Sequence, residues 1–369
     1  MNVRELLRRI GPALGLVATW TLFALLAGSK FTSWSNHELM ALQTAVVGTA
    51  AVGATWIIVS GGIDLSVGAT IALGTMVIAS LVRMGLPAGL AALVGVATAA
   101  LIGAGIGALV IGELGRVAGV ALGVVAGFVL AKSSGIVLGI SVGATVAVLS
   151  ALVLRRLFGR VELSPFIVTL GLWGALRGLA KGLGDNQPVY AETPDAMATM
   201  ARLCELMSVD SGIALPTGVW ILIAVAAVAA LAMRFTVFGR HVFAIGSNEE
   251  TARLCGLRVE RTKVLVYMLA LACAGVAAVL QTSYLSMGDP TTAQGYELKV
   301  IAAAVIGGAS LSGGQGSIAG TLVGALIMTV VDNGCTKLGM DNWVQELVTG
   351  AIIVAAVALD RLRTRSANA

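Results

Sequence analysis

Residues 41–68 read ALQTAVVGTAAVGATWIIVSGGIDLSVG, and this stretch decides the fold class. Its first part, residues 41–59, is an uncharged run of about the 20 residues that an α-helix needs to cross the hydrocarbon core of a bilayer. The run ends at two adjacent glycines, which weaken a helix, and an acidic residue follows them. The sequence therefore predicts a membrane-spanning helix that stops or breaks at Gly61 and Gly62.

The rest of the chain repeats this pattern. Charged residues make up 12% of the 369 residues and hydrophobic residues 57%, whereas soluble domains carry about 25% charged residues. Further apolar segments lie at 10–27, 65–81, 88–111, 117–130, 135–154, 166–179, 219–233, 264–285, 300–311, 317–331 and 343–359. We predict an all-α, polytopic transmembrane helix bundle with about 10–12 spans, some broken or re-entrant, as a single domain over residues 1–369.

The distribution of basic residues predicts the orientation. With the N-terminus in the cytoplasm, sixteen Lys and Arg residues fall in inner segments and five in outer loops, as the positive-inside rule requires. We therefore expect a multi-pass protein of a bacterial inner membrane with both termini cytoplasmic. The net charge of +5 reflects these loops, so we expect membrane lipid as a neighbour and no nucleic-acid partner.

Several kinds of site are missing from the sequence. The chain has four cysteines without a CxxC pair and only two histidines, so we expect no metal site and no catalytic set. It contains no GxxxxGK[ST] stretch, so it does not hydrolyse nucleotide by a P-loop, and we expect no cofactor. The glycine-rich stretch 307–316 instead predicts a tight turn between two half-spans.

The first candidate functional stretch runs from Gly61 to Gly68. Asp64 would be costly in lipid if it were charged and unpaired, so it must face protein, water or the membrane boundary. We take Gly61, Gly62, Asp64 and Ser66 as candidate substrate-path residues. Two other interpretations remain open: Asp64 caps the following helix by accepting from its first amides, or it makes a polar contact between helices.

A second candidate stretch starts a helix at Ser164 and Pro165. Its residues Phe166 and Thr169 are candidates for the substrate path, because an aromatic ring can stack on a sugar and a hydroxyl can bond to it. Ordinary helix packing is the competing interpretation.

The loop 235–263, which is inside in this orientation, contains a capping box, Ser247-Asn248-Glu249-Glu250, and Gly256 is a natural stop for the short helix. Such a short helix is marginal in water, so we expect it to dock on a partner rather than lie on lipid. The candidate docking residues are Gly246, Ser247, Asn248, Glu249, Glu250, Ala252, Arg253 and Gly256.

Four stretches together resemble one family. They are GGIDLSVG at 61–68, PFIVTLG at 165–171, GRHVFAIGSNEETARLCG at 239–256 and GYELKVIAAAVIGG at 295–308. This combination resembles the ribose/xylose/arabinose-type permeases of bacterial ATP-binding-cassette (ABC) importers. Branched-chain amino-acid permeases are similar in architecture but usually lack the Gly-Gly-Ile-Asp-Leu-Ser stretch.

The resemblance implies a set of partners. These are a cytoplasmic ABC ATPase on a separate chain, a periplasmic sugar-binding protein, and a second permease subunit. It also implies that the helix in the loop 235–263 is the coupling helix that sits in a cleft of the ATPase, and that the acidic outer loop 182–216 faces the binding protein. This chain departs from the family by an extra helix pair within about 88–154.

An ion-coupled secondary transporter of a small polar solute is the alternative function. It would use ionisable groups in mid-span, for which Asp64, Glu297, Lys299 and Asp332 are the candidates.

Overall fold

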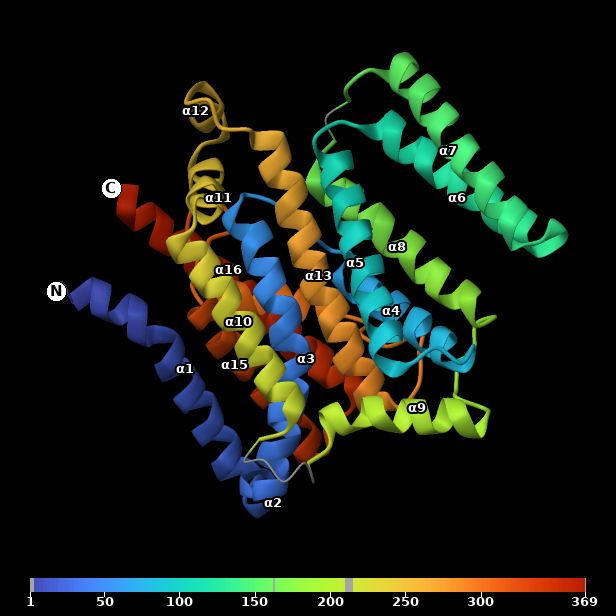
Figure 1. Cartoon of the computed structure of the whole chain (residues 1–369). Coiled ribbons are helices and arrows are strands. Elements are labelled where there is room, and N and C mark those ends of the chain that lie inside the picture. The colour runs from blue at the N-terminus through green and yellow to red at the C-terminus, as the bar shows by residue number, and fades with distance from the viewer. Residues whose placement is uncertain (1–2, 162, 210–214, 369) are drawn as a thin grey trace.

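The computed structural model describes residues 3–161, 163–209 and 215–368 (Figure 1). Its helices are α1 Val3–Ala27, α2 Ser29–Thr32, α3 Trp34–Val59, α4 Val67–Arg83, α5 Ala88–Val110, α6 Leu114–Ser134, α7 Ile136–Phe158, α8 Pro165–Leu183, α9 Pro194–Cys204, the 3-10 turn η1 Glu205–Met207, α10 Thr217–Phe235, α11 Val237–Ser247, α12 Glu249–Leu254, α13 Val259–Leu285, α14 Tyr296–Ile306, α15 Ile318–Lys337 and α16 Asn342–Asn368. Within these residues the only β-pairing is an isolated bridge between Val189 and Gly288.

The predicted all-α membrane bundle is confirmed. Seven helices in the described part of the chain are long and apolar enough to cross a membrane, and three shorter apolar helices lie at Gly11–Ala27, Val67–Arg83 and Leu114–Gly127. Each predicted apolar segment overlaps a helix. The segment predicted at 300–311 runs past the end of its helix, because α14 begins at Tyr296 and already ends at Ile306, where the glycine turn starts.

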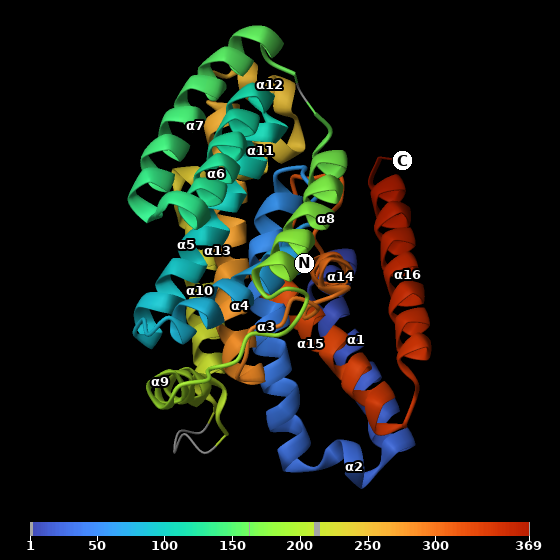
Figure 2. The ribbon, with the colours of Figure 1, turned by 90° about the vertical axis from the view of Figure 1, so that its right-hand side faces the viewer.

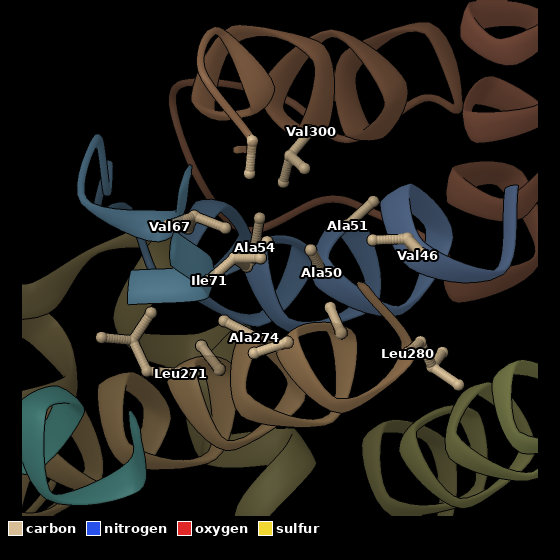
Figure 3. Packing of buried hydrophobic residues seen from close by; sticks show 14 of the residues in the cluster. Val46, Ala50, Ala51, Ala54, Val67, Ile71, Leu271, Ala274, Leu280 and Val300 are labelled. Atoms are coloured by element: carbon tan, nitrogen blue, oxygen red, sulfur yellow. The ribbon is translucent and has the colours of Figure 1, made fainter. Parts of the chain in front are cut away.

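Helices α3 and α13 run antiparallel through the centre of the bundle (Figure 1). Figure 3 shows α3 between α13 on one side and α14 on the other, with Ala50, Ala54 and Ala274 at the contact. Gly53 lies so close to α13 that a side chain there would strike the Ala270 carbonyl. Small residues let helix backbones approach closely, and in lipid this packing replaces the hydrophobic effect as the force between helices.

Two irregular segments interrupt this central layer. Residues 60–66 connect α3 to α4, and residues 286–295 connect α13 to the half-helix α14. The turn 307–317 then joins α14 to α15, where Gly307 abuts Gly320 and Gly324 abuts Ala303. The expected broken helices and the expected tight turn are therefore present.

Helices α6 and α7 form a hairpin beside the main bundle (Figure 1). Gly115, Gly119 and Gly123 of α6 pack directly on the backbone of α7. At its base, the buried Glu113 carboxylate lies 3.3 Å from Arg116, 3.5 Å from Arg155 and 3.7 Å from Arg160. The hairpin lies almost entirely within the range 88–154 given for the extra pair, whose status as an addition to the family stays a prediction, and both of its ends join the bundle on one side.

The two ends of the bundle differ in what they display. Helix α12, the C-terminus and the base of the α6–α7 hairpin lie toward one end, which we call the coupling end (Figure 1). Helices α2 and α9 lie at the opposite end, which we call the far end. The loops expected to be cytoplasmic therefore gather at the coupling end.

Candidate functional site

Neighbouring residues pack closely around Gly62 in the segment 60–66. Gly61 adopts a φ of +82°, which turns the chain back at the end of α3. A side chain at Gly62 would meet the Tyr267 hydroxyl at 2.7 Å and the Ile57 side chain at 3.0 Å. The chain thus passes through a slot that only glycine fits.

Asp64 forms a local turn rather than a helix cap. Its Oδ1 accepts hydrogen bonds from the Ser66 backbone N–H at 2.7 Å and from the Ser66 hydroxyl at 2.6 Å. The capping interpretation is wrong, because α4 begins only at Val67 and its N-cap is Ser66, whose side chain caps no amide. Asp64 is only 3% exposed, and its Oδ2 has no hydrogen-bond partner within the described residues.

The predicted path residues on α8 lie in two different environments. Thr169 is fully buried, and its hydroxyl donates to the Pro165 carbonyl one turn earlier at 2.9 Å. Phe166 is 49% exposed on the outside of the same helix. The structure supports the packing interpretation for Thr169 and leaves Phe166 available, so their part in a substrate path stays a prediction.

The segment 286–295 was missed by sequence reasoning and has the same turn chemistry. Asp289 Oδ1 accepts from the Thr291 N–H at 2.8 Å and from the Thr291 hydroxyl at 2.7 Å. The signal that could have identified it is Asp289-Pro290-Thr291, which matches Asp64-Leu65-Ser66 as an acidic residue followed two residues later by a hydroxyl.

This second segment is held by a helix from elsewhere in the chain. Arg177 of α8 donates from Nη1 to the Pro290 carbonyl at 3.0 Å and to the Thr292 carbonyl at 2.6 Å. The Gln281 amide donates to the Thr292 hydroxyl at 2.8 Å. Thr291 and Gln294 nevertheless remain exposed. Arg177 therefore links α8 to the segment 286–295. From the sequence, Arg177 could be placed only at or within a span.

The expected docking helix is present at the coupling end as α12. Its cap is Asn248, whose Oδ1 accepts from the Thr251 N–H at 2.8 Å. The predicted cap at Ser247 is wrong, because α11 continues through that residue and its hydroxyl donates back to the Phe243 carbonyl at 2.9 Å. Gly256 ends the helix with a φ of +82°, as predicted.

Ion pairs fasten α12 to the start of α13. Glu249 lies 2.6 Å from the Lys263 amine, and Arg253 lies 2.7 Å from the Glu260 carboxylate and 3.4 Å from Glu249.

The outward side of α12 is open for a partner. Ala252 faces inward in a small apolar cluster with Ile245 and Val259. Glu250 is exposed, and Leu254 is 86% exposed. An exposed leucine next to an exposed carboxylate on a short, fixed helix fits a protein-docking surface better than a solvated loop.

The coupling end is in direct contact with the 60–66 segment and with the 307–317 turn. Gly246 at the end of α11 touches the Val59 carbonyl at the end of α3. A Cβ at Gly313 would lie 3.0 Å from Gly61, and one at Gly314 would lie 3.0 Å from Ser247. The Gly314 N–H donates to the Val59 carbonyl at 2.9 Å. The end of α11 therefore packs directly against the 307–317 turn and the start of the 60–66 segment.

No group of three metal-binding side chains occurs in the part of the chain that the structure describes.

Comparison with known proteins identifies the family. The family described as "Branched-chain amino acid transport system / permease component" matches residues 106–357. The chain is 34% identical to the ribose import permease protein RbsC of Escherichia coli K12, over 94% of this chain and 92% of that protein. It is 32% identical to the probable ABC transporter permease protein YphD of the same strain, over 98% and 92% of the two chains.

A third relative covers less of the chain. The L-arabinose transport system permease protein AraH of Escherichia coli K12 is 34% identical over 56% of this chain and 61% of that protein. No solved structure matches. From the matched family, the full-length relatives and the apolar helices, we conclude that this chain belongs to the permease-component family of ABC importers, as a multi-pass inner-membrane transport subunit and not an enzyme.

Proposed function

We propose that this chain is the membrane-spanning subunit of an ABC importer that moves a monosaccharide or a related polyol across the inner membrane. The names of its relatives, which import ribose and arabinose, support the sugar. The family description mentions branched-chain amino acids, but the Gly61-Gly62-Ile63-Asp64-Leu65-Ser66 stretch, which those permeases usually lack, supports the sugar branch.

The observation that carries the proposal is the contact between the end of α11, which α12 follows directly, and the interrupted centre of the bundle. A partner seated on Glu250 and Leu254 would move α12, and α11 would transmit that motion through Gly246 to the Val59 carbonyl and the 307–317 turn. Coupling of this kind suits a transporter that is driven by a separate ATPase.

The partners follow from this proposal. The ATPase docks on the coupling end in the cytoplasm, where both termini also lie, and a periplasmic binding protein delivers the sugar to the far end near the loop 182–216. A second permease subunit completes the path. ATP binding closes the ATPases and opens the path outward, and hydrolysis resets it. Because the binding protein supplies affinity, sugar contacts within the path are few and weak.

The test is ATP-dependent uptake in proteoliposomes that contain this chain with its ATPase, its binding protein and a panel of radiolabelled sugars. We expect uptake to need both ATP and the binding protein. Glu250→Arg should abolish uptake and binding-protein-stimulated ATP hydrolysis without loss of folded protein, whereas the matched variant Glu250→Gln should keep most of both.

The alternative of an ion-coupled transporter makes a different prediction. Its best support is the Lys299–Asp332 ion pair between α14 and α15, at 2.6 Å. Uptake that follows a proton or sodium gradient in liposomes without the ATPase would establish that alternative and reject the importer.

A further inference from the structure

Three polar side chains meet between α8 and α14. Trp173 and Arg177 lie one turn apart on α8, and Glu297 lies in the first turn of α14. The Trp173 indole lies beside the Glu297 carboxylate, and Arg177 is close enough for its charge to act on Glu297. Trp173 Nε1, Arg177 Nη2 and Glu297 Oε2 are buried, and none has a well-formed hydrogen bond to a described residue.

These three atoms lack partners although the residues that carry them are held in place. Arg177 is anchored through Nη1 on the carbonyls of Pro290 and Thr292, so Nη2 is left over in a fixed position. Glu297 sits at the N-terminus of α14, where the helix dipole favours a negative charge. Two donor side chains therefore lie near the Glu297 carboxylate, whose Oε2 also lies close to Gly68 at the start of α4. Buried polar atoms without partners cost free energy, and such groups within a membrane usually serve function.

The cluster lies behind a face that the chain leaves open. Figure 2 shows α14 between α8 and α16 on this side of the molecule. Gln294 and Leu298 of the α14 region are exposed here. Gly174 and Gly178 of α8 are also exposed, and a Cβ on either would meet no atom within 4 Å.

Helix α14 is connected to the coupling end through the turn that follows it. It has only 11 residues and is suspended between two irregular segments, 286–295 and 307–317. The second of these segments touches Gly246 and Ser247 at the coupling end. A displacement that starts at α12 would reach α14 and separate it from α8, and this would expose the three unused atoms.

We propose that Trp173, Arg177 and Glu297 form a gated contact site for a pair of neighbouring hydroxyl groups on the sugar in transit. The Glu297 carboxylate accepts a hydrogen bond from one hydroxyl. The Arg177 guanidinium and the Trp173 indole N–H donate to the hydroxyl oxygens. The site is closed in this structure and opens when α14 moves. This inference rests on the proposed function, because it assigns a site to the sugar.

The experiment measures uptake of D-ribose and of 2-deoxy-D-ribose by the complete complex in proteoliposomes at saturating binding protein. If another sugar of the panel is imported best, that sugar and its monodeoxy analogues replace this pair. The variants are Glu297→Gln, Arg177→Lys and Trp173→Phe. The matched control is Lys181→Met, which removes an exposed charge one turn further along α8. Binding-protein-stimulated ATP hydrolysis is measured in parallel.

We expect Glu297→Gln and Arg177→Lys to slow uptake of the full sugar by about 10-fold or more, the effect of losing a hydrogen bond to a charged group. In these two variants, ATP hydrolysis stimulated by the binding protein should stay near the wild-type rate. Sugar uptake by Lys181→Met should also stay near the wild-type rate. For the deoxy analogue that lacks the bonded hydroxyl, wild type should already be slow, and the same variants should change its uptake less than about 2-fold.

Two outcomes would overturn the inference alone while the importer stands. In one, the variants slow both sugars equally or lose stimulated ATP hydrolysis, which indicates a structural role. In the other, they import the full sugar at the wild-type rate, and the unused atoms then bind only water. A wild-type complex that imports no sugar of the panel would reject the proposed function, and this inference with it.

Discussion

The segments 60–66 and 286–295 contain the same turn in different surroundings. In the first, Asp64 accepts from the Ser66 N–H and hydroxyl at 2.7 and 2.6 Å. In the second, Asp289 accepts from those two groups of Thr291 at 2.8 and 2.7 Å. Asp64 and Ser66 are buried, whereas Thr291 is exposed and its neighbours are held by Arg177. Identical local chemistry therefore occurs in a buried segment in one place and in a partly exposed segment in the other.

The difference comes from which part of the chain covers each segment. The first lies against Tyr267 and Ile57, which belong to the central helices α13 and α3. The second is linked to α8 at the edge of the bundle (Figure 2) by Arg177, and it also packs on α4, where Gly288 lies against Ala79, but its residues Thr291 and Gln294 are exposed. Exposed residues of the second segment can be substituted without disrupting the core. We therefore expect the first segment to respond to substitution through stability and the second through transport.

The largest contrast should come from the glycines. Gly62→Val must displace Tyr267 or Ile57, and we expect a cost of about 3 kcal/mol or loss of folded protein. Gly295→Ala meets no neighbour within 4 Å, and its cost is the strain of a φ of +78°, about 1 kcal/mol. Thermal unfolding of the purified protein in detergent measures both. Equal losses would contradict the assignment of the first segment as the buried one.

The acidic residues should give the next largest contrast. Asp64→Ala leaves the buried Ser66 N–H and hydroxyl without an acceptor, and we expect a loss of about 2 kcal/mol. Asp289→Ala should cost less than about 1 kcal/mol, because water can reach Thr291. The unfolding midpoints in detergent decide between them. A more destabilising Asp289→Ala would reverse the comparison.

The ion pair between Lys299 and Asp332 tests how firmly α14 is held against α15. Lys299 and Asp332 are about three-quarters buried, with 24% and 25% of their side chains exposed. Lys299→Met should destabilise the protein by about 1–2 kcal/mol, because it leaves Asp332 without its partner. The exchanged pair Lys299→Asp with Asp332→Lys should recover part of that loss in the same unfolding assay. No recovery would mean that the pair does not hold α14.

The smallest contrast isolates burial alone. Ser66→Ala and Thr291→Ala remove the same hydroxyl from the same turn, and Ser66 is buried whereas Thr291 is exposed. We expect about 1 kcal/mol for Ser66→Ala and less than about 0.5 kcal/mol for Thr291→Ala. Double variants with the matching Asp→Ala change show whether the turn itself accounts for each loss. Identical small losses would show that burial does not distinguish the two turns.

Sequence reasoning found the helices and the coupling loop but misplaced two caps. It put the cap of α12 at Ser247 instead of Asn248, and it allowed Asp64 to cap α4, which begins at Val67. Both errors concern where a helix begins or ends, because neighbouring residues with similar side chains compete for the same role. The backbone at Asn248 is extended whereas Ser247 is still helical, and no feature of the two residue types predicts this.

The candidate site was predicted only in part. The glycine pair before Asp64 drew attention to the 60–66 segment, which is a packed wall in this conformation. The charged residues that meet between α8 and α14 have no common sequence signature, because Arg177 and Glu297 are far apart in the chain. Only the path of the chain through α14 brings them together.

By itself, the sequence determined that the chain folds in a lipid bilayer and that its architecture is a helix bundle. A chain with 12% charged residues and repeated apolar runs must place helices in lipid, since an unpaired backbone there is too costly, and its basic loops predict the orientation. The tertiary structure alone decided which interruption is closed and which is open. Burial depends on the helices that happen to lie alongside, and neither turn carries that information in its own residues.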